Sequence, residues 1–244
     1  MTGPKKIVPL HETDLARIAL LPTDQKRVEL RRLREFVPRH SWTPFRSALP
    51  AIFQARKSLL DLPRATLQEI EAGIVRSCIR HPEWIAPNLE LARLLFMHTD
   101  ETKVSSVEWS FGGLATGLGG AVRYWPEFYI VEKDTPLVVS CDPRRGNGYN
   151  KLAHSFVFSA MYHHIARGDF ADAKFRIASF PVNRSEKTRS IRYVEMTSEH
   201  LIEYEKLNSA VQETYKIWFE VLEQREEEIR RRRPATGTGG FFDV

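Results

Sequence analysis

Cysteine is scarce in this chain, whose 244 residues include only Cys78 and Cys141. Two thiols are too few for a disulfide framework or a four-cysteine zinc site, so neither is expected. The sequence also lacks any apolar run of the roughly 18 residues that a membrane-spanning helix needs. No apolar segment follows the basic residues near Met1, so we expect no secretory signal and predict a protein of the reducing cytoplasm.

The signature motifs of several enzyme classes are missing as well. Neither the GxSxG pattern of serine hydrolases nor the HExxH pattern of zinc proteases occurs in the sequence. His154 and His164 share a predicted helix at a spacing that does not suit a zinc pair. The glycines between Gly112 and Gly120 match neither the Walker pattern nor the dinucleotide fingerprint, so they predict a turn. No cofactor is therefore expected from motifs.

The composition allows a globular fold with a mild positive charge. Hydrophobic residues make up 42% of the chain, which is enough to bury a sizeable core. The formal net charge is +5 and the pI about 9.2, which permits contact with nucleic acid or with an acidic protein surface. An excess of this size is also common among ordinary soluble proteins.

The hydrophobic periodicity changes along the chain and predicts an α+β fold. Between residues 124 and 180, two strand-like runs separated by Lys133–Pro136 precede a helix over Leu152–Ile165 and a strand over Phe175–Phe180. This order predicts a small mixed β-sheet with a helix, preceded by helices and followed by one long helix. We expect a helical region over residues 1–100, an α+β core over 101–196, a helix over 197–233 and a linker-like tail over 234–244.

Three helical features can be assigned to residues. A helix is predicted over Ala51–Leu62, and Thr66 with Glu69 forms a capping box that begins another. The last helix carries an apolar seam at spacings of three and four residues: Leu201, Tyr204, Asn208, Val211, Tyr215, Trp218 and Leu222. The aromatic pair Phe241–Phe242 follows a glycine-rich linker and is a candidate hook for a partner or a protease adaptor.

Arginines gather in two places that could contact phosphate. Arg27, Arg31 and Arg34 lie on one predicted helix, and Arg144 and Arg145 precede the predicted helix N-terminus near Leu152. They are the candidate nucleic-acid-binding residues, with DNA as the expected ligand. The alternative is that both groups are solvated surface.

One short segment resembles a known type of docking peptide. Gln54 precedes a Ser-Leu-Leu-Asp-Leu cluster that contains Ser58, Leu59, Leu60 and Leu62. The segment resembles the peptides by which bacterial proteins dock on the replicative sliding clamp. In those peptides a glutamine bonds at the edge of an apolar cleft and large apolar side chains fill it. The spacing from glutamine to the first leucine is longer here, and no phenylalanine closes the motif.

The central region resembles, in its order of elements, the PD-(D/E)xK nuclease core. In that family, carboxylates on two neighbouring strands hold Mg²⁺ and a lysine helps to activate water. The corresponding acids here are Glu127 and Asp142, with Glu108 as a substitute ligand. Ser140 stands where the family has its second acid, and Asp142 where it has its lysine. We therefore favour a degenerate core without catalysis or metal, and keep a Mg²⁺-dependent DNA nuclease as the alternative.

The chain as a whole resembles the SocB-type bacterial toxins in size, basic character, absence of a catalytic motif and its Gln54–Leu62 segment. The resemblance implies a non-catalytic protein that binds the sliding clamp and blocks DNA replication. It also implies an antitoxin-like partner that delivers the toxin to a protease. A transcription regulator is a third hypothesis, although no helix-turn-helix pattern is present.

Overall fold

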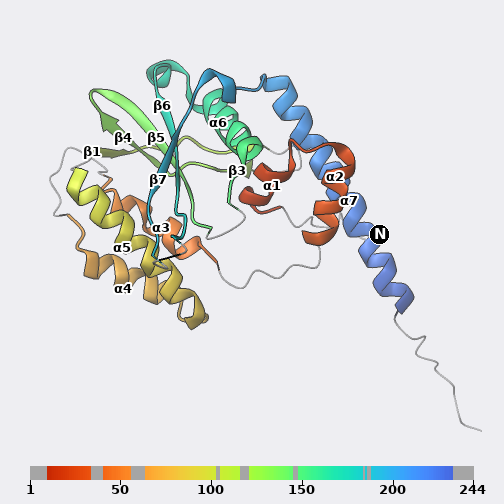
Figure 1. Ribbon diagram of the computed structural model, residues 1–244, viewed down its shortest axis with the longest axis horizontal. Coiled ribbons are helices and arrows are strands. Elements are labelled where there is room, and N and C mark those ends of the chain that lie inside the picture. Colours follow the sequence, from red (N-terminus) through yellow and green to blue (C-terminus); the bar gives the residue numbers. More distant parts are fainter. Residues whose placement is uncertain are drawn as a thin grey trace, which may run out of the picture.

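The computed structural model describes residues 10–33, 41–55, 64–102, 105–115, 121–144, 148–183, 185 and 188–232. It confirms the predicted α+β fold, with N-terminal helices, a mixed sheet and a long C-terminal helix (Figure 1). The helices are α1 (Glu12–Ile18), α2 (Thr23–Leu33), α3 (Thr43–Ile52), α4 (Leu67–Ser77), α5 (Ile85–Thr102), α6 (Lys151–Ile165) and α7 (Tyr204–Arg232). Three short 3₁₀ helices are η1 (Pro82–Trp84), η2 (Gly168–Phe170) and η3 (Ser198–His200). The strands are β1 (Ser105–Glu108), β2 (Leu114–Ala115), β3 (Ala121–Val122), β4 (Phe128–Glu132), β5 (Thr135–Asp142), β6 (Lys174–Ser179) and β7 (Arg192–Glu195).

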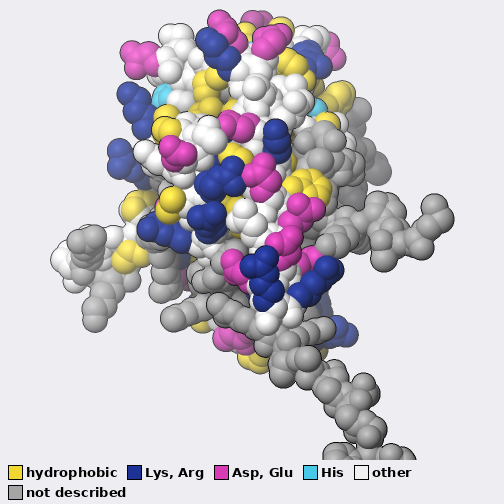
Figure 2. Space-filling view, turned by 90° about the vertical axis from the view of Figure 1, so that its right-hand side faces the viewer, with side chains coloured by type: hydrophobic (Ala, Val, Ile, Leu, Met, Phe, Trp, Pro, Cys, Tyr) yellow, Lys and Arg dark blue, Asp and Glu magenta, His cyan; other side chains and the backbone are white. Residues whose placement is uncertain are grey.

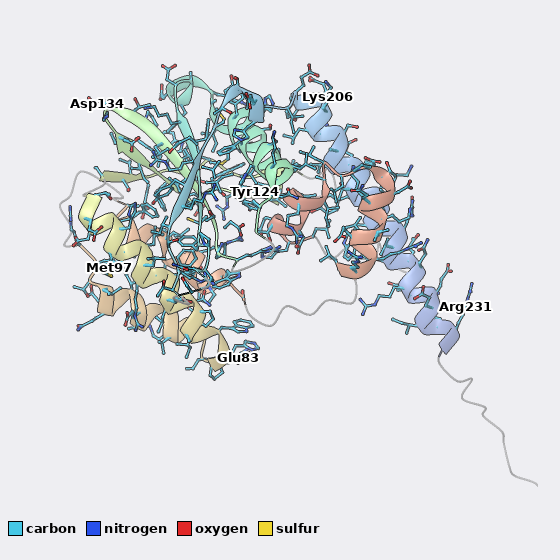
Figure 3. The ribbon with its side chains drawn as sticks, viewed as in Figure 1. Glu83, Met97, Tyr124, Asp134, Lys206 and Arg231 are labelled. Carbon is cyan, nitrogen blue, oxygen red and sulfur yellow. The ribbon has the colours of Figure 1, made fainter. Side chains whose placement is uncertain are left out.

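The main sheet has five strands in the order β1-β4-β5-β6-β7, and β2 and β3 form a separate pair. β5 and β6 are parallel and joined through α6, whereas the other neighbours are antiparallel. The turn between β4 and β5 is tight because Lys133 and Asp134 both adopt positive φ, at 50° and 61°. Such a pair matches the twist of the two strands, and Figure 3 places Asp134 at the tip of this hairpin.

The sheet separates two hydrophobic cores because side chains alternate along each strand. In β5, Leu137 and Val139 face a core built with α3, α4 and α5. Val138 between them faces a second core built with α1, α2, α6 and α7. The helices that precede the sheet therefore divide between its two faces (Figure 1). Among the described residues, no helix is long and apolar enough to cross a membrane.

Helix α7 lies against α2 through both apolar and charged contacts. Its buried face is centred on Leu207, Val211 and Trp218, while the predicted seam residue Tyr204 is 46% exposed. The predicted seam is thus correct in its middle and wrong at its start, where α7 only begins at Tyr204. On α2, Lys26 is almost fully buried and pairs with Glu213 of α7.

The helix predicted over Ala51–Leu62 is wrong in its bounds. Helix α3 begins at Thr43, with Pro44 in its first turn, and ends at Ile52. Proline is tolerated in a first helical turn, where its missing N–H would have no intrahelical partner. Because α3 ends at Ile52, Gln54 lies beyond the helix, and residues 56–63 lie outside the described part.

Candidate partner-docking site

Gln54 closes α3 in a strained backbone conformation. The Ala55 N–H donates to the Pro50 carbonyl at 2.8 Å and the Gln54 N–H to the Ala51 carbonyl at 3.1 Å. These two bonds form a Schellman motif, whose C′ residue adopts the left-handed region. Gln54 occupies that position with φ of 55°, where glycine is the usual residue. A side chain there costs about 1 kcal/mol or more.

The Gln54 side chain has no use inside the described fold. It is partly exposed, and within the described ranges no group bonds to its amide. A side chain that is held in a strained backbone position and bonds to no described residue is a candidate for contact with another protein.

The backbone before and after the docking segment is firmly held. Phe53, next to Gln54, is buried and packs against Phe128 of β4, with ring centroids 5.1 Å apart. The Thr99 hydroxyl of α5 donates to the Ile52 carbonyl at 3.1 Å. On the far side, Thr66 and Glu69 form the predicted capping box, which confirms the start of α4. The predicted contact residues between these anchors, Ser58, Leu59, Leu60 and Leu62, lie outside the described residues.

The three acids of the nuclease alternative are not gathered into a metal site. Among the described residues, which include all three, no group of three or more His, Cys, Asp or Glu side chains could hold a metal. Glu127 pairs with Arg123 at the surface, and Glu108 lies on β1 opposite Phe128. The fold therefore does not bring Glu108, Glu127 and Asp142, the ligand set of the nuclease alternative, together as one such group.

Asp142 has a structural environment of its own. Its side chain is buried and accepts the backbone N–H of Tyr149 at 2.7 Å and of Arg144 at 3.3 Å. Burial raises the pKa of its carboxyl group, and these two bonds oppose that shift. Asp142 thus holds the backbone of Arg144, just after β5, and of Tyr149, just before α6.

The described arginines predicted to bind nucleic acid have partners within the chain. Arg27 pairs with Glu220 of α7 at 2.7 Å, and Arg31 donates to Gln224 at 3.5 Å. Arg144 pairs with Asp14 of α1 at 2.9 Å. Figure 2, which faces the side carrying α2 and α7, shows basic and acidic side chains interspersed. Arg34 and Arg145 lie outside the described residues.

Sequence comparisons agree with one another. Residues 13–228 match the family model described as sliding clamp-binding bacterial toxin SocB. The chain is 39% identical over 235 residues to the DNA replication inhibitor toxin SocB of Caulobacter vibrioides, covering 96% of both chains. No solved structure matches the chain.

Proposed function

The chain belongs to the SocB family of sliding clamp-binding bacterial toxins, and we propose that it blocks DNA replication by docking its Gln54–Leu62 segment on the clamp. The observation that carries this proposal is the left-handed Gln54 at the end of α3, whose side-chain amide bonds to no group of the described residues. A glycine there would relieve the strain, so the glutamine side chain is the feature that a partner can use.

The proposed contact has two parts with different physical roles. The Gln54 amide offers donors and an acceptor, which fix the register of the segment at the rim of an apolar cleft. Leu59, Leu60 and Leu62 would bury in the cleft and supply most of the affinity. The Schellman motif and the capping box of α4 hold the two ends of the segment close to the core. Less conformational entropy is then lost on docking than for a free peptide.

Docking of this kind needs no catalysis. A toxin seated in the cleft would exclude the polymerases and repair proteins that use the same cleft, and replication would stop for lack of a tethered polymerase. We propose also that an antitoxin or protease adaptor recognises the toxin, as the family resemblance implies. DNA contact by the arginines of α2 stays a prediction.

The direct test measures binding of the purified full chain to the purified sliding clamp. Gln54→Ala and Leu59→Ala/Leu60→Ala are each expected to weaken binding by about thirtyfold or more, since hot-spot residues carry at least about 2 kcal/mol. Gln68→Ala is the matched control, because Gln68 is an exposed glutamine on the adjacent α4. Equal affinities for wild type, Gln54→Ala and the leucine variant would exclude this segment as the docking site.

A further inference from the structure

A groove that the clamp hypothesis does not use lies between α1 and α2. Its volume is about 650 Å³, and Asn150 at the N-terminus of α6 closes one side. Pockets that bind ligands commonly measure about 300–1,000 Å³. The groove belongs to the core on the face of the sheet opposite to α3 and Gln54, so it is separate from the proposed clamp contact.

The floor of the groove is apolar and open. It is lined by Ile18 at the end of α1, Leu21 in the turn that follows, and Val28 and Leu33 of α2. Val28 is 48% exposed, which is unusual for a side chain directed into a groove between two packed helices. The rim carries both charges: Asp14, Asp24 and Glu29 line it beside Arg17 and Arg32, and Arg32 pairs with Glu29 at 2.7 Å. The apolar floor suits a large apolar anchor.

The chain itself contains a segment of this chemistry. Phe241 and Phe242 are followed by Asp243. The two aromatic rings match the apolar floor of the groove. Residues 233–244 lie outside the described part of the structure, so their sequence and their attachment point carry the argument.

The attachment point is close enough. Helices α2 and α7 run side by side, and Arg31 near the end of α2 contacts Gln224 of α7 (Figure 1). From Gln224 to Arg232 the helix rises by about 12 Å at about 1.5 Å per residue. Figure 3 shows Arg231 at this projecting end of α7.

The glycine-rich linker is long enough to span the distance from the end of α7 back to the groove. The nine residues from Arg232 to Phe241 give a mean reach of about 15–18 Å as a flexible chain, and about 30 Å when extended. That reach covers the step back from the end of α7 to Leu33 and Val28. A tether of this length gives an effective concentration of order millimolar, at which two aromatic anchors suffice for docking.

From the apolar floor of the groove and the reach of the linker, we propose that Phe241 and Phe242 dock in the α1–α2 groove of their own chain. In this state the groove covers the two aromatic rings, and a partner that binds them cannot reach them.

A site-specific photo-crosslink in the full-length chain tests the proposal. A benzoyl-phenylalanine in place of Phe242 is irradiated in dilute solution, and the attachment sites are mapped by mass spectrometry. Crosslinks within one chain to residues 14–33 are expected. Val28→Glu should lower their yield at least about fivefold, because it places a carboxylate on the apolar floor against the aromatic rings.

The matched control is Val75→Glu on α4, where the valine is 42% exposed and lies in the other helical layer. It should leave the yield unchanged, and circular dichroism checks that both variants are folded. Hydrogen exchange gives a second readout: Phe241→Ser/Phe242→Ser should speed exchange over 23–33 but not over 67–77. Crosslinks only between two chains, crosslinks elsewhere, no crosslinks, or a yield unaffected by Val28→Glu would each overturn the proposal.

Discussion

Replacing Gln54 with glycine should raise stability while it abolishes clamp binding. Gln54 has φ of 55°, a conformation that costs a side-chain-bearing residue about 1–2 kcal/mol relative to right-handed backbone. Glycine avoids this cost but loses about 0.5–1 kcal/mol more backbone entropy on folding. The net gain is about 0.5–1 kcal/mol. At about 2–4 °C per kcal/mol for a chain of this size, Tm should rise by about 1–4 °C.

The comparison with Gln54→Ala separates the two effects. Alanine removes the amide but keeps a Cβ in the left-handed region, so it should lose clamp binding without the rise in Tm. Thermal unfolding followed by circular dichroism gives the stabilities, and titration with the purified clamp gives the affinities. A lower Tm for Gln54→Gly would show that the strain argument is wrong. Wild-type clamp affinity in Gln54→Gly would show that the side chain has no docking role.

Four further predictions concern the interactions that hold the fold. Glu213→Gln removes the counter-charge of the Lys26 ammonium, whose side chain is only 3% exposed, and should lower the free energy of unfolding by about 2 kcal/mol; this is less than for a fully buried pair because Glu213 is 40% exposed. Lys26→Met removes the buried charge itself and should cost clearly less stability in urea unfolding. Equal losses for the two variants would refute the charge argument. The hydrogen bonds from Lys26 and from a neighbouring threonine lower the pKa of Glu213 in the folded protein. The stabilisation from this pair is therefore present above the ordinary carboxyl pKa of 4.5 and is lost as the pH falls through the lowered pKa of the folded state. The account would be contradicted if the stability difference between pH 3 and pH 6 were no larger for wild type than for Glu213→Gln. Thr66→Ala should cost about 1 kcal/mol by removing the capping box, and Thr66→Ser should retain most of the stability, both measured by thermal unfolding. Gly148→Ala places a Cβ 2.8 Å from a buried carboxylate oxygen of Asp142 and should cost about 1–3 kcal/mol; an unchanged Tm would mean that this loop adapts freely.

Local signals in the sequence predicted local structure well. The capping box at Thr66 and the turn at Lys133–Asp134 appear as expected, because both depend on residues a few positions apart. The order of strands β4 and β5, helix α6 and strand β6 also follows from their hydrophobic periods.

Long-range features could not be predicted in the same way. Nothing in the pattern of α1 to α5 says which face of the sheet each helix covers, because that depends on tertiary packing. The start of α3 at Thr43 has no clear sequence signal, because Pro44 lies in its first turn and Pro50 inside it, and proline usually disfavours a helix interior.

The candidate site shows the same division. Gln54 was found from its place before a leucine cluster, but its left-handed conformation has no sequence signal, since glycine is the usual residue there. The acids of the nuclease alternative were chosen from strand order alone. Their side chains have separate surroundings, with Asp142 buried beside its own loop and Glu127 paired at the surface. The α1–α2 groove was missed because it is formed by two helices whose apolar residues read separately as core.

The central claim is that Gln54 mediates clamp docking and thereby stops replication. The most direct measurement is clamp-dependent primer extension by a purified bacterial replicative polymerase, with wild type and Gln54→Gly added at equal concentrations. The account predicts that wild type inhibits extension, that added clamp relieves the inhibition, and that Gln54→Gly is inactive although it is at least as stable. Equal inhibition by both proteins would contradict the account.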